Sequence, residues 1–185
     1  MIKDGAGKGY FAKVDKNNRL WTYSTQRKEI AFQSEYNQSA YMTYGKRNFV
    51  NAGVDEGILH LLYTGSGSLH IDKITISTNS DICKVELYVG TTYVSGGTLV
   101  EGINLNRGSN GTSETTIYNG VGDDLSFSYD DDNELMDIRL SKNTFSFDFE
   151  GGLILRANNS IGILGEVASA GDKIRTSVYF YEEQD

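Results

Sequence analysis

The sequence predicts an all-β protein: a two-sheet antiparallel sandwich, with the jelly roll as the favoured type, preceded by an extended N-terminal arm. Three observations lead to this expectation. From about residue 48 onward, apolar and polar residues alternate over short stretches. Turn-forming residues separate these stretches, in a chain with 21 Gly and no Pro. The 12 Tyr and eight Phe favour strands over helices.

The pattern divides the chain into an N-terminal arm, residues 1–47, and a β-sandwich domain, residues 48–185. The arm has no sustained period, although apolar residues at helical spacing allow one short helix within 26–37. Its run Asp15–Asn18 has the chemistry of a turn between two short apolar and aromatic pieces. A free solvated tail rarely carries so many aromatic residues, so we expect the arm to lie on its own body or on another subunit.

The strands of the sandwich domain follow from the alternation. Residues 58–63 are apolar on both faces, as expected of a central strand. Over 69–76 the apolar set slips by one position, which predicts a β-bulge near Asp72 and Lys73. Further alternating stretches are predicted as strands at 82–89, 99–105, 125–129, 136–140, 145–155, 161–167 and 173–180. This number of short strands, with no convincing helix between them, is typical of a sandwich.

Charge is distributed unevenly along the chain. Residues 1–47 carry nine Lys/Arg and four Asp/Glu, a net charge of +5, and the remainder carries −13, which together give −8. A basic arm on an acidic body favours contact between neighbouring copies, because opposite potentials steer association. The alternative is that the acidic body only keeps the protein soluble. Nucleic acid is not an expected partner of such a body, since binding to phosphates needs clustered cations, and only the arm could touch it.

The sequence offers little for catalysis. His60 and His70 each lie inside a predicted strand, where a histidine is more often a packed or surface residue than a base. No Gly-x-Ser-x-Gly motif occurs, and two His with one Cys give no zinc-binding spacing. The lone Cys83 is expected to be a small buried apolar residue. We therefore predict a protein that is not an enzyme and needs no cofactor.

One acidic run is a candidate metal site. Oxygen-rich loops bind calcium, and the run 130–134 offers Asp130, Asp132 and Glu134 as ligands. The helix-loop-helix calcium motif does not fit, because Leu135 occupies the position of its glycine. The alternative is a solvated turn between strands.

No stretch approaches the roughly 20 apolar residues that a membrane helix needs. The N-terminus has a lysine but lacks the apolar run of a secretion signal. We therefore expect a protein that is made in the cytoplasm and has no membrane partner.

Two segments resemble a group of tailed-phage virion structural proteins. Residues 4–20 contain an Asp-Gly-x-Gly opening that runs into Ala-Lys-Val-Asp and then Asn-Arg-Leu, and residues 145–155 form the second likeness, Phe-Ser-Phe-Asp-Phe-Glu-Gly-Gly-Leu-Ile-Leu. The close match covers about 30 residues, and none of them is catalytic in that group. The resemblance implies a component of the virion, assembled in the host cytoplasm. It fits a capsid decoration or head-associated protein, or a part of the neck, tail or fibre.

In that setting the arm is expected to dock the protein. Its partners would be other copies, in a homotrimer, or the major capsid protein and other virion proteins. Tyr10, Phe11 and Trp21 are the predicted aromatic anchors. Salt-sensitive steering would come from the cations Lys8, Lys13, Lys16 and Arg19.

Two other functions remain open. The first is a tail or fibre component whose sandwich binds a receptor glycan through exposed tyrosines and the loops 107–116 and 123–134. The second is an enzyme that cleaves glycans with a pair of carboxylates, for which nothing in the sequence selects a pair.

Overall fold

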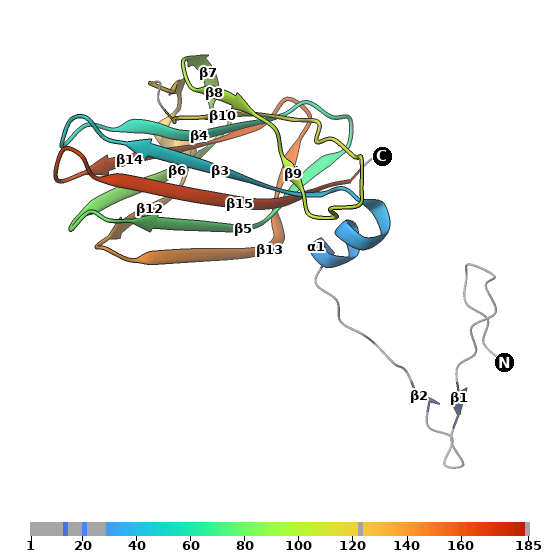
Figure 1. Ribbon diagram of the computed structural model, residues 1–185. Coiled ribbons are helices and arrows are strands. Elements are labelled where there is room, and N and C mark those ends of the chain that lie inside the picture. Colours follow the sequence, from blue (N-terminus) through green and yellow to red (C-terminus); the bar gives the residue numbers. More distant parts are fainter. Residues whose placement is uncertain (1–12, 15–19, 22–28, 122–123, 184–185) are drawn as a thin grey trace.

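The computed structural model describes residues 13–14, 20–21, 29–121 and 124–183. Two large antiparallel sheets pack against each other, so the predicted all-β sandwich is confirmed (Figure 1). The five-stranded sheet has the order β13 (Thr144–Arg156), β5 (Ser68–Thr78), β15 (Lys173–Glu183), β3 (Ala40–Asn48), β9 (Ile103–Asn104). The six-stranded sheet has the order β12 (Glu134–Leu140), β6 (Cys83–Val89), β14 (Ser160–Val167), β4 (Glu56–Tyr63), β10 (Thr115–Asn119), β8 (Thr98–Val100).

The remaining elements lie outside these sheets. Two short ladders join β1 (Lys13–Val14) to β2 (Leu20–Trp21), and β7 (Thr92–Ser95) to β11 (Ser126–Ser128). A short α1 (Glu29–Phe32) continues into the π-helical η1 (Gln33–Asn37), which confirms the helix predicted within 26–37. A 3-10 turn, η2 (Asp131–Asn133), precedes β12. The turn predicted at Asp15–Asn18 lies outside the described residues.

The eight long strands follow the jelly-roll order. Counted along the chain as β3, β4, β5, β6, β12, β13, β14 and β15, one sheet contains the first, eighth, third and sixth strands. The other contains the second, seventh, fourth and fifth. Successive strands therefore cross between the sheets except from β6 to β12, where the chain inserts the segment that contains β7 to β11. This is the favoured topology from the sequence, and it is confirmed.

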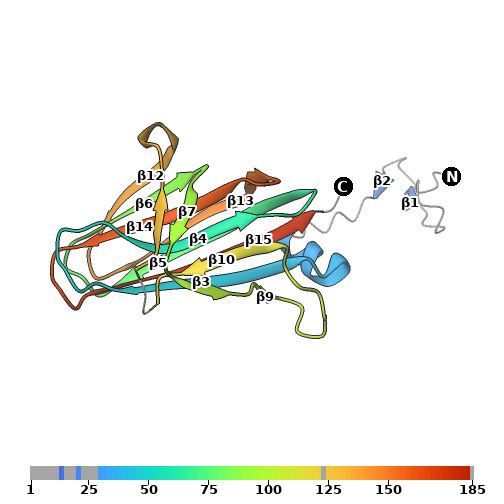
Figure 2. The ribbon, with the colours of Figure 1, turned by 90° about the horizontal axis from the view of Figure 1, so that it is seen from above.

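The core fills the space between the sheets. On β15 the alternation works as predicted: Ile174, Thr176, Val178 and Phe180 are buried, while Arg175, Ser177 and Tyr179 reach solvent. On β4 both faces are buried, because its inner face meets the core and its outer face lies under the β7–β11 pair (Figure 2). The predicted central position of residues 58–63 is therefore confirmed, with β14 on one side and β10 on the other.

The bulge predicted near Asp72 is present. Opposite β15, Lys73 pairs with Tyr179 and Ile71 pairs with Phe180, which leaves Asp72 as the extra residue. This one-residue shift turns both apolar pairs of β5 toward the core, so the slip in the sequence pattern has a structural cause.

Two boundaries drawn from the sequence are wrong. The arm does not extend to residue 47, because β3 begins at Ala40 and pairs with β15 along its whole length. The charge count had assigned Lys46 and Arg47 to the arm, but both lie on a strand of the sandwich. The predicted strand 99–105 is also interrupted, since β8 belongs to one sheet and β9 to the other.

Candidate functional site

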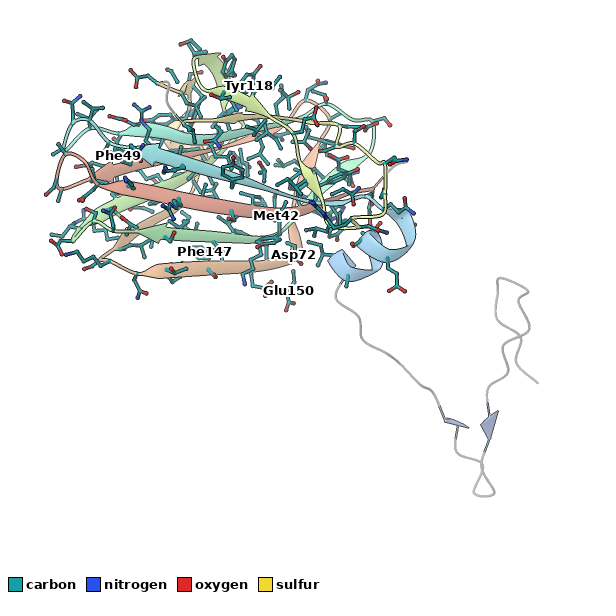
Figure 3. All side chains as sticks on the ribbon, viewed as in Figure 1. Met42, Phe49, Asp72, Tyr118, Phe147 and Glu150 are labelled. Carbon is teal, nitrogen blue, oxygen red and sulfur yellow. The ribbon has the colours of Figure 1, made fainter. Side chains whose placement is uncertain are left out.

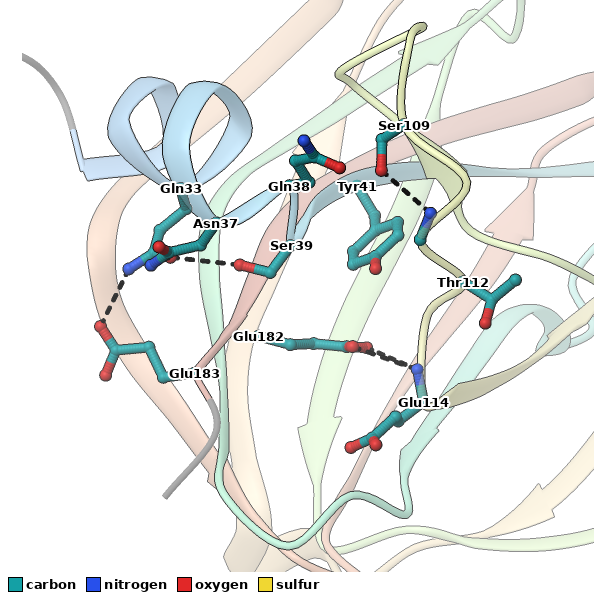
Figure 4. A pocket seen from close by; sticks show the side chains of 11 residues that line it. Gln33, Asn37, Gln38, Ser39, Tyr41, Ser109, Thr112, Glu114, Glu182 and Glu183 are labelled. Carbon is teal, nitrogen blue, oxygen red and sulfur yellow. Dashed lines mark hydrogen bonds between the residues drawn. The ribbon is translucent and has the colours of Figure 1, made fainter.

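A polar cleft of about 760 Å³ lies at the end of the sandwich where the helical turn enters the fold (Figure 4). We call it the entry cleft. It is built from η1, the start of β3, the loop before β10 and the end of β15. Its lining residues are Gln33, Asn37, Gln38, Ser39, Tyr41, Ser109, Gly111, Thr112, Glu114, Glu182 and Glu183.

A buried carboxylate fastens the loop to the sheet. Glu182 on β15 is 6% exposed and accepts hydrogen bonds from the hydroxyls of Ser113, at 2.5 Å, and Thr115, at 2.7 Å. The backbone N–H of Glu114 donates to both of its carboxylate oxygens at 3.1 Å. Since charge-assisted bonds are the stronger class, Glu182 fixes the shape of the cleft wall.

A buried amide fastens the helical turn on the opposite wall. Gln33 is 4% exposed, and its Oε1 accepts from Asn37 at 2.6 Å and from the Ser39 hydroxyl at 3.1 Å. Its Nε2 donates to Glu183 at 3.4 Å, which joins η1 to β15. The segment just after the arm is thereby held against the C-terminal strand.

The cleft is anionic. Its lining contains Glu114, Glu182 and Glu183 but no Lys, Arg or His. Burial, followed by the charges of Glu182 and Glu114, raises the pKa of Tyr41, so its phenol stays neutral. Neutral hydroxyl and amide groups beside carboxylates suit hydrogen bonding to a hydroxyl-rich ligand. With no His or Cys in the lining, the cleft offers no nucleophile–base pair of the Ser-His or Cys-His kind.

The predicted docking residues fall in the arm. Lys8, Tyr10, Phe11, Lys16 and Arg19 lie outside the described residues. Of the other two, Lys13 and Trp21 are direct partners in the β1–β2 ladder. The structure therefore places one predicted cation and one predicted anchor opposite each other.

The acidic run 130–134 does not form a metal centre. Its first residue, Asp130, caps η2 by accepting a hydrogen bond from the backbone N–H of Asp132 at 3.1 Å. Glu134 follows as the first residue of β12, and all three side chains are exposed. Within the described part of the chain, no group of three or more His, Cys, Asp or Glu is arranged to hold a metal ion. These acids form the solvated turn that was the alternative.

Sequence reasoning found only one wall of the entry cleft. The loop 107–116, predicted as a glycan-contacting loop, supplies Ser109, Gly111, Thr112 and Glu114. The loop 123–134 supplies none of the lining residues. Gln33 and Glu183 are 150 positions apart, so no local pattern could have brought them together.

No helix in the described ranges is long and apolar enough to cross a membrane. Comparison of the chain with protein-family models, with curated proteins and with solved structures found no match.

Proposed function

We propose that the chain is a structural protein of a tailed-phage virion, a capsid decoration or head-associated protein that its N-terminal arm docks onto the particle. The observation that carries the proposal is the separation of body and arm. All strands of both large sheets lie within 40–183, and every described residue of the main core cluster lies between Tyr41 and Phe180. A basic segment precedes this body, and the body does not depend on it for a strand.

Charge supports the same division after the boundary is corrected. Residues 1–39 carry seven Lys/Arg and four Asp/Glu, a net charge of +3, and residues 40–185 carry −11. Opposite potentials on arm and body favour repeated contacts in a symmetric assembly, for which we propose a homotrimer. Jelly rolls are common in viral capsids. A shared fold alone does not indicate a shared function, so this argument supports the proposal only together with the resemblance of residues 4–20.

The test measures binding of the purified protein to phage particles that lack it, prepared from the phage that encodes the chain. Deleting residues 1–24 should abolish co-sedimentation while the far-UV circular dichroism of the sandwich persists. Trp21→Ala should weaken binding at all salt concentrations, and replacing Lys8, Lys13, Lys16 and Arg19 by Gln should weaken it most at low salt.

The matched control replaces two cations of the body, Lys173→Gln with Arg175→Gln, and should bind as the intact chain does. Full binding by the chain that lacks residues 1–24 would rule the arm out as the docking element.

The entry cleft favours a second candidate, a tail or fibre component that binds a receptor glycan. Its amide, hydroxyl and carboxylate lining fits a sugar, and the predicted loop 107–116 forms one wall. A glycan array should then detect a ligand, and Asn37→Ala, in the cleft, should weaken its binding. Asn110→Ala, an exposed loop residue outside the lining, is the control. An array without any reproducible ligand would argue against this function.

A further inference from the structure

One side of the sandwich is open. β12 and β13 are the last strands of their sheets, and both lie along the same side of the molecule (Figure 1). Their inner-facing residues stand opposite buried ones, as in the pairs Ile138–Val85 and Phe147–Ile74, yet remain partly exposed. We call this surface the open edge; it consists of Met136, Ile138, Leu140, Phe145, Phe147, Phe149 and Leu153.

The open edge combines an aromatic row with a long edge strand. Figure 3 labels Phe147 on β13. Its ring centroid lies 4.6 Å from that of Phe145 and 6.1 Å from that of Phe149. Phe145 is 38% exposed. β13 is 13 residues long and pairs only with β5 among the described strands, through Thr144–Asp148 and Leu153–Arg156. An edge strand of this length with apolar side chains is a template for pairing with another strand.

The N-terminal segment holds a hairpin that needs such a partner. β1 and β2 pair only with each other in the described chain, through Lys13–Trp21 and Val14–Leu20. A two-stranded ladder of this size is marginal in water on its own and gains stability by joining a larger sheet. One copy of the chain therefore has an unpaired hairpin and an unpaired sheet edge that do not meet each other.

Charge and position match the two surfaces. Residues 1–28 contain seven Lys/Arg and two Asp/Glu, a net charge of +5, whereas residues 130–156, which form the open edge and its flanks, have seven Asp/Glu and three Lys/Arg, a net charge of −4. α1, which begins directly after residues 1–28, contacts β13. At about 3.3 Å per extended residue, 28 residues could span roughly 90 Å, more than the roughly 40 Å length of β13.

We propose that residues 1–28 of one copy bind the open edge of a neighbouring copy, with the β1–β2 hairpin continuing the five-stranded sheet beyond β13. Strand addition supplies main-chain hydrogen bonds, and the aromatic row of the edge receives aromatic side chains of the segment. This pairing rests on the proposed function, which makes the arm the docking element, and it names a second copy of the chain as the partner of the arm.

Sedimentation velocity of four forms of the protein tests the pairing. The intact chain should self-associate, and the association should weaken as salt rises from about 0.05 to about 0.5 M, where screening shortens the reach of charges. Deletion of residues 1–28 and Phe145→Lys should each give monomers with a cooperative thermal transition. Leu99→Lys, at an apolar residue 64% exposed on β8, is the matched control and should associate as the intact chain does.

Mixing separates this pairing from other modes of association. The deleted chain keeps its open edge, and the Phe145→Lys chain keeps its N-terminal segment, so an equimolar mixture should form heterodimers although neither associates alone. If the lysine variant does not fold, Phe145→Thr tests the same position with a residue that favours strands.

Three results would overturn the pairing: a monomeric intact chain, self-association of the deleted chain, or unchanged self-association of a folded Phe145 variant. The proposed function is tested by a different measurement, the binding of the chain without residues 1–24 to phage particles. Failure of the pairing and failure of the proposed function can therefore be distinguished.

Discussion

At the scale of single residues, His60 is a polar group buried in an aromatic environment. It lies on β4, 1% exposed, with ring centroids of Phe127 at 5.4 Å, Tyr93 at 6.1 Å and Tyr118 at 6.4 Å. Burial lowers the pKa of its imidazole to about 4, and neither ring nitrogen has a hydrogen-bond partner among the described residues. His60 is therefore neutral in the folded protein at neutral pH.

This depressed pKa predicts a pH-dependent stability. The unfolded chain, in which the pKa of the histidine is 6.5, binds more protons than the folded one between pH 6.5 and about 4. The contribution of His60 is complete above pH 6.5 and is lost as pH falls through this window, by about 3 kcal/mol in total. Urea unfolding at several pH values should give a smaller loss for His60→Phe than for the intact chain. Equal losses would contradict the assignment.

Arg47, which the charge pattern assigned to the basic arm, has a structural role in the sandwich. It is 5% exposed, and its guanidinium donates to the carboxylates of Glu56 and Asp124 and, at 3.4 Å, to the carbonyl of Gly120. These bonds connect β3 to the start of β4 and to the segment that precedes β11. Glu56 is largely buried, with a side chain 13% exposed, whereas the side chain of Asp124 is 93% exposed.

Arg47→Met should lower the free energy of unfolding by about 3–5 kcal/mol, because Glu56 is left as an uncompensated, mostly buried carboxylate. Adding Glu56→Gln should restore part of that loss. Asp124→Asn is the control, and it should cost less than about 1 kcal/mol because the side chain of Asp124 is exposed. Chemical denaturation of the four proteins gives the comparison, and a double variant no more stable than Arg47→Met would argue against a buried charge as the cause.

At the scale of elements, the β7–β11 pair covers the outer face of the six-stranded sheet. Its Phe127 packs in a second apolar cluster with Tyr88, Leu125 and Leu164. The cover can approach closely because β14 has a glycine beneath it: a Cβ at Gly162 would overlap the Phe127 ring.

Gly162→Ala should therefore displace Phe127 and lower the free energy of unfolding by about 1–3 kcal/mol, the usual range for overpacking. The exposed aromatic cluster should also bind more of a hydrophobic fluorescent dye. Gly108→Ala is the control, because the nearest atom to its added Cβ lies at 3.5 Å, in ordinary contact. Equal stability and dye binding for the two variants would show that the cover does not depend on this glycine.

Strand positions could be predicted because alternation reports which face of a strand is buried, as β15 illustrates. The prediction of one strand over 99–105 was wrong for a physical reason. At Gly102 the chain crosses between the sheets, and an added Cβ would lie within 3.4 Å of Ser113, Phe180 and Tyr41. Alternation continues across this crossing, so the sequence pattern does not reveal it.

At the scale of the whole molecule, the structure predicts which N-terminal deletions the sandwich tolerates. Deleting residues 1–28 removes no strand of either large sheet, so at high salt the melting temperature should change by no more than about 3 °C. Deleting residues 1–47, the boundary drawn from charge, removes nearly all of β3 and the buried Tyr41, and should abolish the cooperative transition. Thermal melts followed by circular dichroism test both deletions. A folded protein of residues 48–185 would support residue 47 as the end of the arm.

The sequence by itself determined that the protein is a β-sandwich, where most strands lie and where β5 is bulged, because burial against a sheet imposes a period of two that is local in the chain. Only the tertiary structure decided the start of the body at Ala40, the entry cleft and the open edge. These features depend on which strands become neighbours and which remain at an edge. Such contacts join residues up to 150 positions apart, and no local pattern encodes them.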